Sequence, residues 1–128
     1  MQKLKVPSEI EAYYEAFLAA DLEGILACFS PDAEVRSTGL PQPARGPAQL
    51  RAYFEAMLDL SRDMKLHRHR FLVIPQAVSV TSEITMPLPG RGPTPYLFTS
   101  VQVYELDDAG LISRLLTFTD LDGAVPMG

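Results

Sequence analysis

Hydrophobic periodicity changes about halfway along this chain, and the change restricts the possible folds. Before residue 61 apolar residues recur every three or four positions, whereas after residue 63 the segments are rich in Val, Ile, Thr, Phe and Tyr. Short turn-forming sequences, such as Asp107-Asp108-Ala109-Gly110, separate these later segments. Because short connections join antiparallel neighbours, we predict a four-stranded antiparallel meander. The predicted strands are residues 64–74, 77–86, 95–106 and 111–121.

Three amphipathic helices are predicted in the first half of the chain. Ser8 and Glu11, three residues apart, have the form of a capping box for the first helix. Asp21 is placed to cap the second helix, and Pro47 suits the first turn of the third. The predicted helices are residues 8–20, 22–29 and 47–60.

A short strand is predicted between the second and third helices, because apolar and polar residues alternate over residues 33–38. The three helices must bury their apolar faces, and the sheet is the large surface that can receive them. We therefore predict an α+β domain of two layers. It takes in residues 1–128, with a core over about residues 8–121 and a flexible tail over residues 122–128.

Length and composition indicate a single globular domain and argue against several classes of partner. The chain has 128 residues, enough for one domain, of which 47% are hydrophobic and 21% charged. Sixteen acidic residues against 11 basic ones give a net charge of −5, which argues against nucleic acid or an anionic membrane as partner. The single cysteine, Cys28, has no partner for an internal disulfide, and no apolar run is long enough to cross a bilayer. We expect a cytoplasmic protein.

Residues 12–35, AYYEAFLAADLEGILACFSPDAEV, and residues 45–50, RGPAQL, carry a resemblance to a known family. With the four strands that follow, the chain resembles the nuclear transport factor 2-like superfamily, and within it the SnoaL-like and ketosteroid-isomerase-like group. The resemblance implies a cone, in which a curved antiparallel or mixed sheet wraps around the three helices and encloses a mostly apolar pocket. It also implies a homodimer through the outer face of the sheet. The half-apolar outward faces of the predicted strands support that expectation.

The ketosteroid isomerase pattern is matched only in part. Tyr13 stands where that class has an oxyanion donor, but Ser37 replaces its aspartate base and Gln102 replaces its protonated aspartate. Phe54 stands in place of a supporting tyrosine. A serine is no base at neutral pH without help, so steroid isomerisation by that mechanism is disfavoured. Tyr13 and Gln102 can still polarise a carbonyl, or they can be a core tyrosine and a structurally paired amide.

His67 and His69 are the two histidines of the chain. Their spacing on a predicted strand places both on one face, the face of Phe71 and Val73. A neutral imidazole there can replace the missing carboxylate as base, or the two rings can belong to a polar, solvated strand. No Cys or Glu stands at a spacing that suggests a third zinc ligand, so we expect no metal and no organic cofactor.

Side chains on the predicted inner faces define a candidate pocket for a small, flat, largely apolar ligand. In the alternative, the same side chains fill the interior and leave no cavity. The candidate lining is Phe29, Ser37, Phe54, Met57, Leu58, Met86, Phe98, Ser100, Leu115 and Thr117.

Two functional hypotheses follow. The first is a cofactor-independent isomerase, cyclase or dehydratase acting on a small hydrophobic carbonyl or aromatic compound, with Tyr13 and Gln102 as donors and His67 or His69 as base. The second is a non-catalytic module for ligand binding or dimerisation. The replacement of both carboxylates favours the second hypothesis, and the polar residues of the predicted pocket favour the first.

Overall fold

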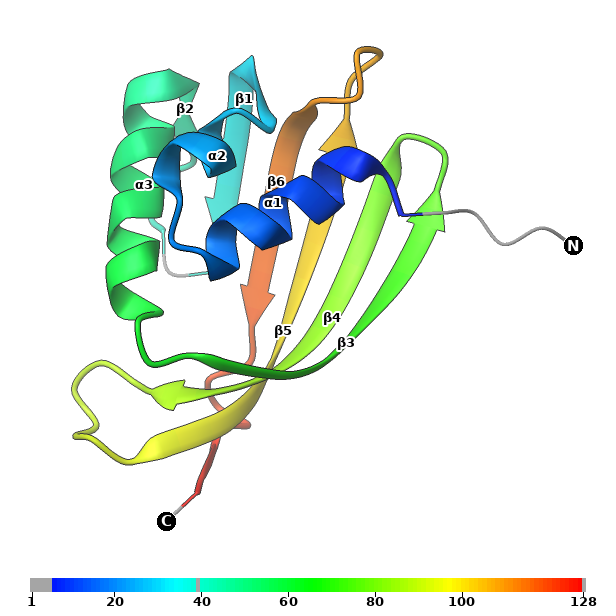
Figure 1. Ribbon diagram of the computed structural model, residues 1–128. Helices are drawn as coiled ribbons and strands as arrows, with labels where there is room; N and C mark the ends of the chain where they lie inside the picture. Colours follow the sequence, from blue (N-terminus) through cyan, green and yellow to red (C-terminus); the bar gives the residue numbers. More distant parts are fainter. Residues whose placement is uncertain (1–5, 39, 128) are drawn as a thin grey trace, which may run out of the picture.

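The predicted α+β architecture is confirmed in the computed structural model, in which helices lie against one face of a curved sheet (Figure 1). The structure describes residues 6–38 and 40–127, apart from the side chains of residues 68 and 69. The elements in chain order are α1 (Ser8–Leu18), α2 (Leu22–Leu26), β1 (Phe29–Ser37), β2 (Ala44–Arg45), α3 (Gly46–Leu60), β3 (Lys65–Ile74), β4 (Ala77–Pro87), β5 (Pro95–Leu106), β6 (Ile112–Thr119) and β7 (Val125–Pro126).

The sheet is built on the predicted meander, with β3, β4, β5 and β6 paired antiparallel in sequence order. Strand β1 joins it parallel to β6, with Val35 opposite Leu115, so the sheet is mixed. Strand β2 pairs with β1, giving the order β2-β1-β6-β5-β4-β3. The two edges do not meet, and the sheet curves around α1 and α3 without closing into a barrel (Figure 1).

The hydrophobic core lies between the helices and the concave face of the sheet. Helix α1 contributes Ile10 and Tyr13, and α3 contributes Leu50 and Phe54. The alternating inward residues of the strands meet them, because one face of each strand is turned towards the helices. The inward strand residues of this core include Val35, Val78, Val80, Tyr104, Ile112 and Leu115.

The helix boundaries differ from the sequence predictions. Helix α1 begins directly after Pro7, and the Ser8 hydroxyl contacts Glu9, so the predicted capping box is wrong. The Asp21 cap is confirmed, because its carboxylate accepts a hydrogen bond from the Gly24 N–H over 3.0 Å. None of the helices in residues 6–38 and 40–127 is long and apolar enough to span a membrane.

Strand β1 begins four residues earlier than predicted, at Phe29. Pairing with β6 explains the difference, since Phe29 stands opposite Ile112 in the ladder and is buried. A register shift follows within β1, over the part that contains Pro31, where a residue without an N–H is tolerated. The segment expected to be a loose tail contains β7, which pairs with β5 at Tyr96 and Leu97.

Candidate functional site

A cavity of about 370 Å³ lies between α1, α3 and the concave face of the sheet. Its lining includes side chains that are almost fully buried, such as Ser82, Ser100 and Tyr104. It also includes two large apolar side chains that face water, Leu18 and Leu60, which are 62% and 50% exposed. Because some lining residues are buried and others face water, the cavity is a pocket with an interior and a mouth. The interior of the cone is therefore not filled by its own side chains.

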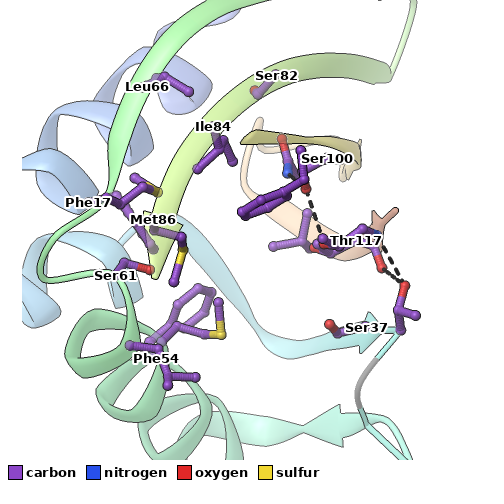
Figure 2. Close-up of a pocket in the computed structure, with 18 of the residues that line it drawn as sticks. Phe17, Ser37, Phe54, Ser61, Leu66, Ser82, Ile84, Met86, Ser100 and Thr117 are labelled. Carbon is purple, nitrogen blue, oxygen red and sulfur yellow. Dashed lines mark hydrogen bonds between the residues drawn. The ribbon is translucent and has the colours of Figure 1, made fainter. Parts of the chain in front are cut away.

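The two sides of the pocket differ in polarity. Phe54 of α3 and Ile84 and Met86 of β4 stand on one side in Figure 2. Ser37 of β1 and Thr117 of β6 stand opposite them (Figure 2). The arrangement follows from strand alternation, because each strand presents every second residue to the interior. A ligand in this cavity meets mainly hydrocarbon and sulfur beside Phe54, Ile84 and Met86, and meets hydroxyl groups beside Ser37 and Thr117.

Most of the side chains predicted to line a pocket are found in this cavity. They are Ser37, Phe54, Met57, Met86, Phe98, Ser100, Leu115 and Thr117. Phe29 is not in the lining: its ring packs against Phe54, with centroids 5.3 Å apart, and supports the wall from the core. Leu58 lines a second cavity instead: it follows Phe54 by one helical turn, nearer the end of α3, and packs at the edge of the core.

A network of hydroxyl and amide groups runs along the polar wall. The Tyr104 hydroxyl donates to the Tyr14 hydroxyl over 3.0 Å, and Tyr14 donates to Gln102 Oε1 over 3.3 Å. Gln102 Nε2 donates to Ser100 Oγ over 2.6 Å, and Ser100 Oγ lies 3.4 Å from Thr119 Oγ1. These five residues are called the tyrosine–glutamine network below. One amide hydrogen of Gln102 is used in this network and the second can point to a ligand.

Tyr13 and Gln102 are predicted from the sequence as site residues, whereas Tyr14 and Tyr104 are not. Both predicted residues line the cavity, and so do the other two. Alternation along the strand could have indicated Tyr104, which lies two positions from Gln102 and therefore on the same face of β5. Tyr14 follows Tyr13 on the apolar side of α1, and no pattern in the sequence distinguishes a pocket tyrosine from a core tyrosine there.

The tyrosines of the pocket are neutral donors at physiological pH. Burial raises the pKa of Tyr14 to about 12 and raises the pKa values of Tyr13 and Tyr104 well above 10.0. Burial also raises the pKa of Tyr53, and the hydroxyl groups of Ser37 and Thr117 oppose this increase. All four phenols therefore keep their protons and can donate hydrogen bonds.

None of the described side chains that line the cavity is ionised at neutral pH. His67 does not reach it: this exposed residue hydrogen-bonds the hydroxyl of Thr85, whose neighbours Ile84 and Met86 face the cavity. The predicted face of His67 is wrong, because a register shift between Leu66 and Arg68 changes the alternation. The side chain of His69 lies outside the described part of the structure. The His69 backbone pairs with Ser82. Within the described residues, no three His, Cys, Asp or Glu side chains come together as a metal site.

The comparison with protein families agrees with this geometry. Residues 10–115 match the SnoaL-like domain. The chain belongs to the SnoaL-like family. The predicted resemblance is thereby confirmed. A search of curated proteins finds no match.

Solved structures of similar fold include proteins of the cyclase type. The epoxide hydrolase/cyclase-like enzyme SalBIII, described in pyran ring formation in the polyether salinomycin, is 18% identical, with a TM-score of 0.76 and 93% of each chain covered. A putative polyketide cyclase from Xanthomonas campestris pv. campestris is 21% identical, with a TM-score of 0.70 and 90% of each chain covered. RV0760c from Mycobacterium tuberculosis, solved with estradiol-17beta-hemisuccinate, is 18% identical, with a TM-score of 0.72 and coverage of 91% of this chain and 95% of its own. At these identities the likeness shows the fold, one shared by cyclase-type and ligand-binding proteins.

Proposed function

We propose that this SnoaL-like protein binds a small, uncharged, largely apolar carbonyl or aromatic compound and acts on it as a cofactor-independent isomerase, cyclase or dehydratase. The observation that supports this proposal is the tyrosine–glutamine network along one wall of a mostly apolar cavity. Solved proteins of the same fold, such as SalBIII, are described as cyclase-like.

The network suits a ligand oxygen that gains negative charge during a reaction. Gln102 has an amide hydrogen free for that oxygen, and Tyr14 and Tyr104 hold its amide in place from the other side. Preorganised neutral donors in a buried site stabilise a developing enolate or alkoxide without needing to reorganise. Gln102 therefore takes the role of donor to the substrate, with Tyr14 and Tyr104 as positioning residues.

A proton-transfer step also requires a base, and His69 keeps that role as a prediction. His67 is far less suited to act as the base, since its ring is hydrogen-bonded to Thr85 and does not line the cavity. The His69 backbone is paired with that of Ser82, a cavity residue. An imidazole is neutral and basic near pH 7, which is what proton abstraction next to a carbonyl requires.

A second candidate function is ligand binding without catalysis. The absence of ionised side chains from the described lining favours it, because neutral donors alone hold a ligand without moving a proton. The same cavity and the same class of ligand serve both candidates, so they differ only in turnover.

Two matched ligands test the binding proposal. We expect 2-acetylnaphthalene to bind at least about 100-fold more tightly than 2-naphthoate, because a carboxylate would lose its hydration without gaining a cation. The substitution Gln102→Leu should weaken the binding of 2-acetylnaphthalene more than it weakens the binding of naphthalene, which has no carbonyl group. Equal affinity for the ketone and the carboxylate, measured by calorimetry, would contradict the proposal.

Turnover then separates the two candidate functions. Compounds that bind are incubated with the wild-type protein, His69→Gln and the control His67→Gln, and products are followed by mass spectrometry and NMR. The enzymatic proposal expects conversion by the wild type and by His67→Gln and a large loss in His69→Gln. Tight binding with no conversion of any bound compound would favour the non-catalytic candidate.

A further inference from the structure

A second cavity, of about 480 Å³, lies where α1 and α3 end. Figure 1 shows these two helix ends on the same side of the sheet. The second cavity shares four lining residues with the first, so the two cavities adjoin along these residues. The shared residues are Phe17, Leu18, Ser61 and Met64.

The second cavity has an apolar floor and a charged rim. Phe17, Leu58 and Met64 are partly buried and pack around the core, whereas Glu55, Asp59 and Arg62 are exposed. Asp59 and Arg62 form an ion pair with each other, so neither charge is left to hold a small ion on its own. This pattern fits an alkyl group that lies on the floor with its end towards water.

Leu18 stands at the boundary between the two cavities and is 62% exposed, although it lines both. When a ligand covers a large apolar side chain that faces water at a pocket mouth, apolar surface is removed from water and binding becomes more favourable. Leu18 is thus placed to contact the part of a ligand that leaves the first cavity.

We propose that the second cavity is a tail subsite, which takes an alkyl tail several carbons long on a ligand whose carbonyl-bearing body occupies the first cavity. This inference rests on the proposed function, since it takes the first cavity as the site of the ligand body. It specifies the substrate class further: an uncharged, oxygenated body with an unbranched apolar tail that passes between the ends of α1 and α3.

A homologous series of ligands tests the tail subsite. The 4-alkylacetophenones from methyl to hexyl keep one carbonyl-bearing ring and lengthen the tail. For the wild type we expect affinity to rise with each methylene by up to about fourfold. Leu18→Ser should reduce this increase per methylene. Leu72→Ser is the matched control: Leu72 is 66% exposed on β3, lines neither cavity, and its replacement should leave the increase unchanged.

The series distinguishes failure of the proposed function from failure of the tail subsite. If 4-methylacetophenone and the other members do not bind at all, the proposed function fails. If the methyl compound binds but affinity does not rise with tail length, the proposed function stands and the tail subsite is wrong. An equal rise in wild type and Leu18→Ser would also overturn the subsite.

A spin label locates the tail directly. With a nitroxide at the end of the hexyl tail, we expect paramagnetic broadening of the backbone amide signals of Ala20 and Asp59, which belong to the second cavity. Val125, in the strand β7, should be broadened less than either of them. Stronger broadening of Val125 than of Ala20 and Asp59 would show that the tail leaves on the other side, past Leu121, an exposed residue of the first cavity's lining, and would overturn the proposal.

Discussion

The hydroxyl of Tyr104 donates a hydrogen bond to the hydroxyl of Tyr14 over 3.0 Å, across 90 positions of sequence. This contact joins the middle of the sheet to the first helix, at the point where the core meets the cavity. Tyr104 is fully buried, and Tyr14 in turn donates to Gln102. The position of the Gln102 amide therefore depends on two phenols that come from different layers of the fold.

Tyr104→Phe should destabilise the protein by about 1–2 kcal/mol. The ring remains, but the hydrogen bond from the buried Tyr104 to the partly buried Tyr14 hydroxyl is lost. The measurement is urea unfolding, with Tyr96→Phe as the control because Tyr96 is only partly buried. We expect the control to change stability by less than about 0.5 kcal/mol. Equal effects of the two substitutions would show that the Tyr104–Tyr14 contact contributes little to stability.

Stability should fall as the pH rises above about 10. The pKa of Tyr14 is raised from 10.0 to about 12 in the folded protein, so the unfolded chain loses the phenolic proton first. The stabilisation by the neutral phenol is fully present below pH 10 and is lost as the pH rises towards 12. Absorbance titration of the tyrosines should give higher pKa values in the native protein than in urea. In Tyr14→Phe the free energy of unfolding should fall less steeply with pH, and an unchanged slope would contradict the assignment.

Ser82→Phe should block the cavity while the protein stays folded. Ser82 is 2% exposed and lines the cavity, so a phenyl group there takes space that a ligand needs. We expect 2-acetylnaphthalene to bind at least about tenfold more weakly, a loss of about 1.4 kcal/mol. Ser79→Phe, on the other face of the same strand, is the control and should bind as the wild type does. If both variants bind as tightly as the wild type, the ligand lies elsewhere.

We also propose that the outer face of the sheet forms a homodimer. Phe118 is 55% exposed on β6, with Val101 of β5 beside it in the ladder. Sedimentation at micromolar concentration should give about 28 kDa, twice the 14.1 kDa of one chain. Phe118→Glu should give a monomer and Phe118→Leu should keep the dimer. A wild-type mass near 14 kDa would reject the proposal.

Much of the fold could be predicted from the sequence because local patterns fix it. The helical spacing around Tyr13 and Phe54 and the alternation along β3 to β6 each require one buried face. The turn at residues 107–110 also follows from local chemistry, since Gly110 has a φ of +86°, which glycine adopts without strain. Strand parity placed Ser100 and Gln102 on the inner face, where both line the cavity.

The tertiary structure decided the rest, because these features depend on segments far apart in sequence. Phe29 belongs to β1 through its pairing with Ile112, which outweighs the helical pattern before it. His67 is turned away from the cavity by one shift of register against β4, and strict alternation along β3 cannot anticipate such a shift. The sequence thus determined which faces are buried. The curvature of the sheet and the packing of α1 and α3 decided that the buried faces leave a cavity between them, since an open space is a property of how surfaces meet rather than of either surface alone.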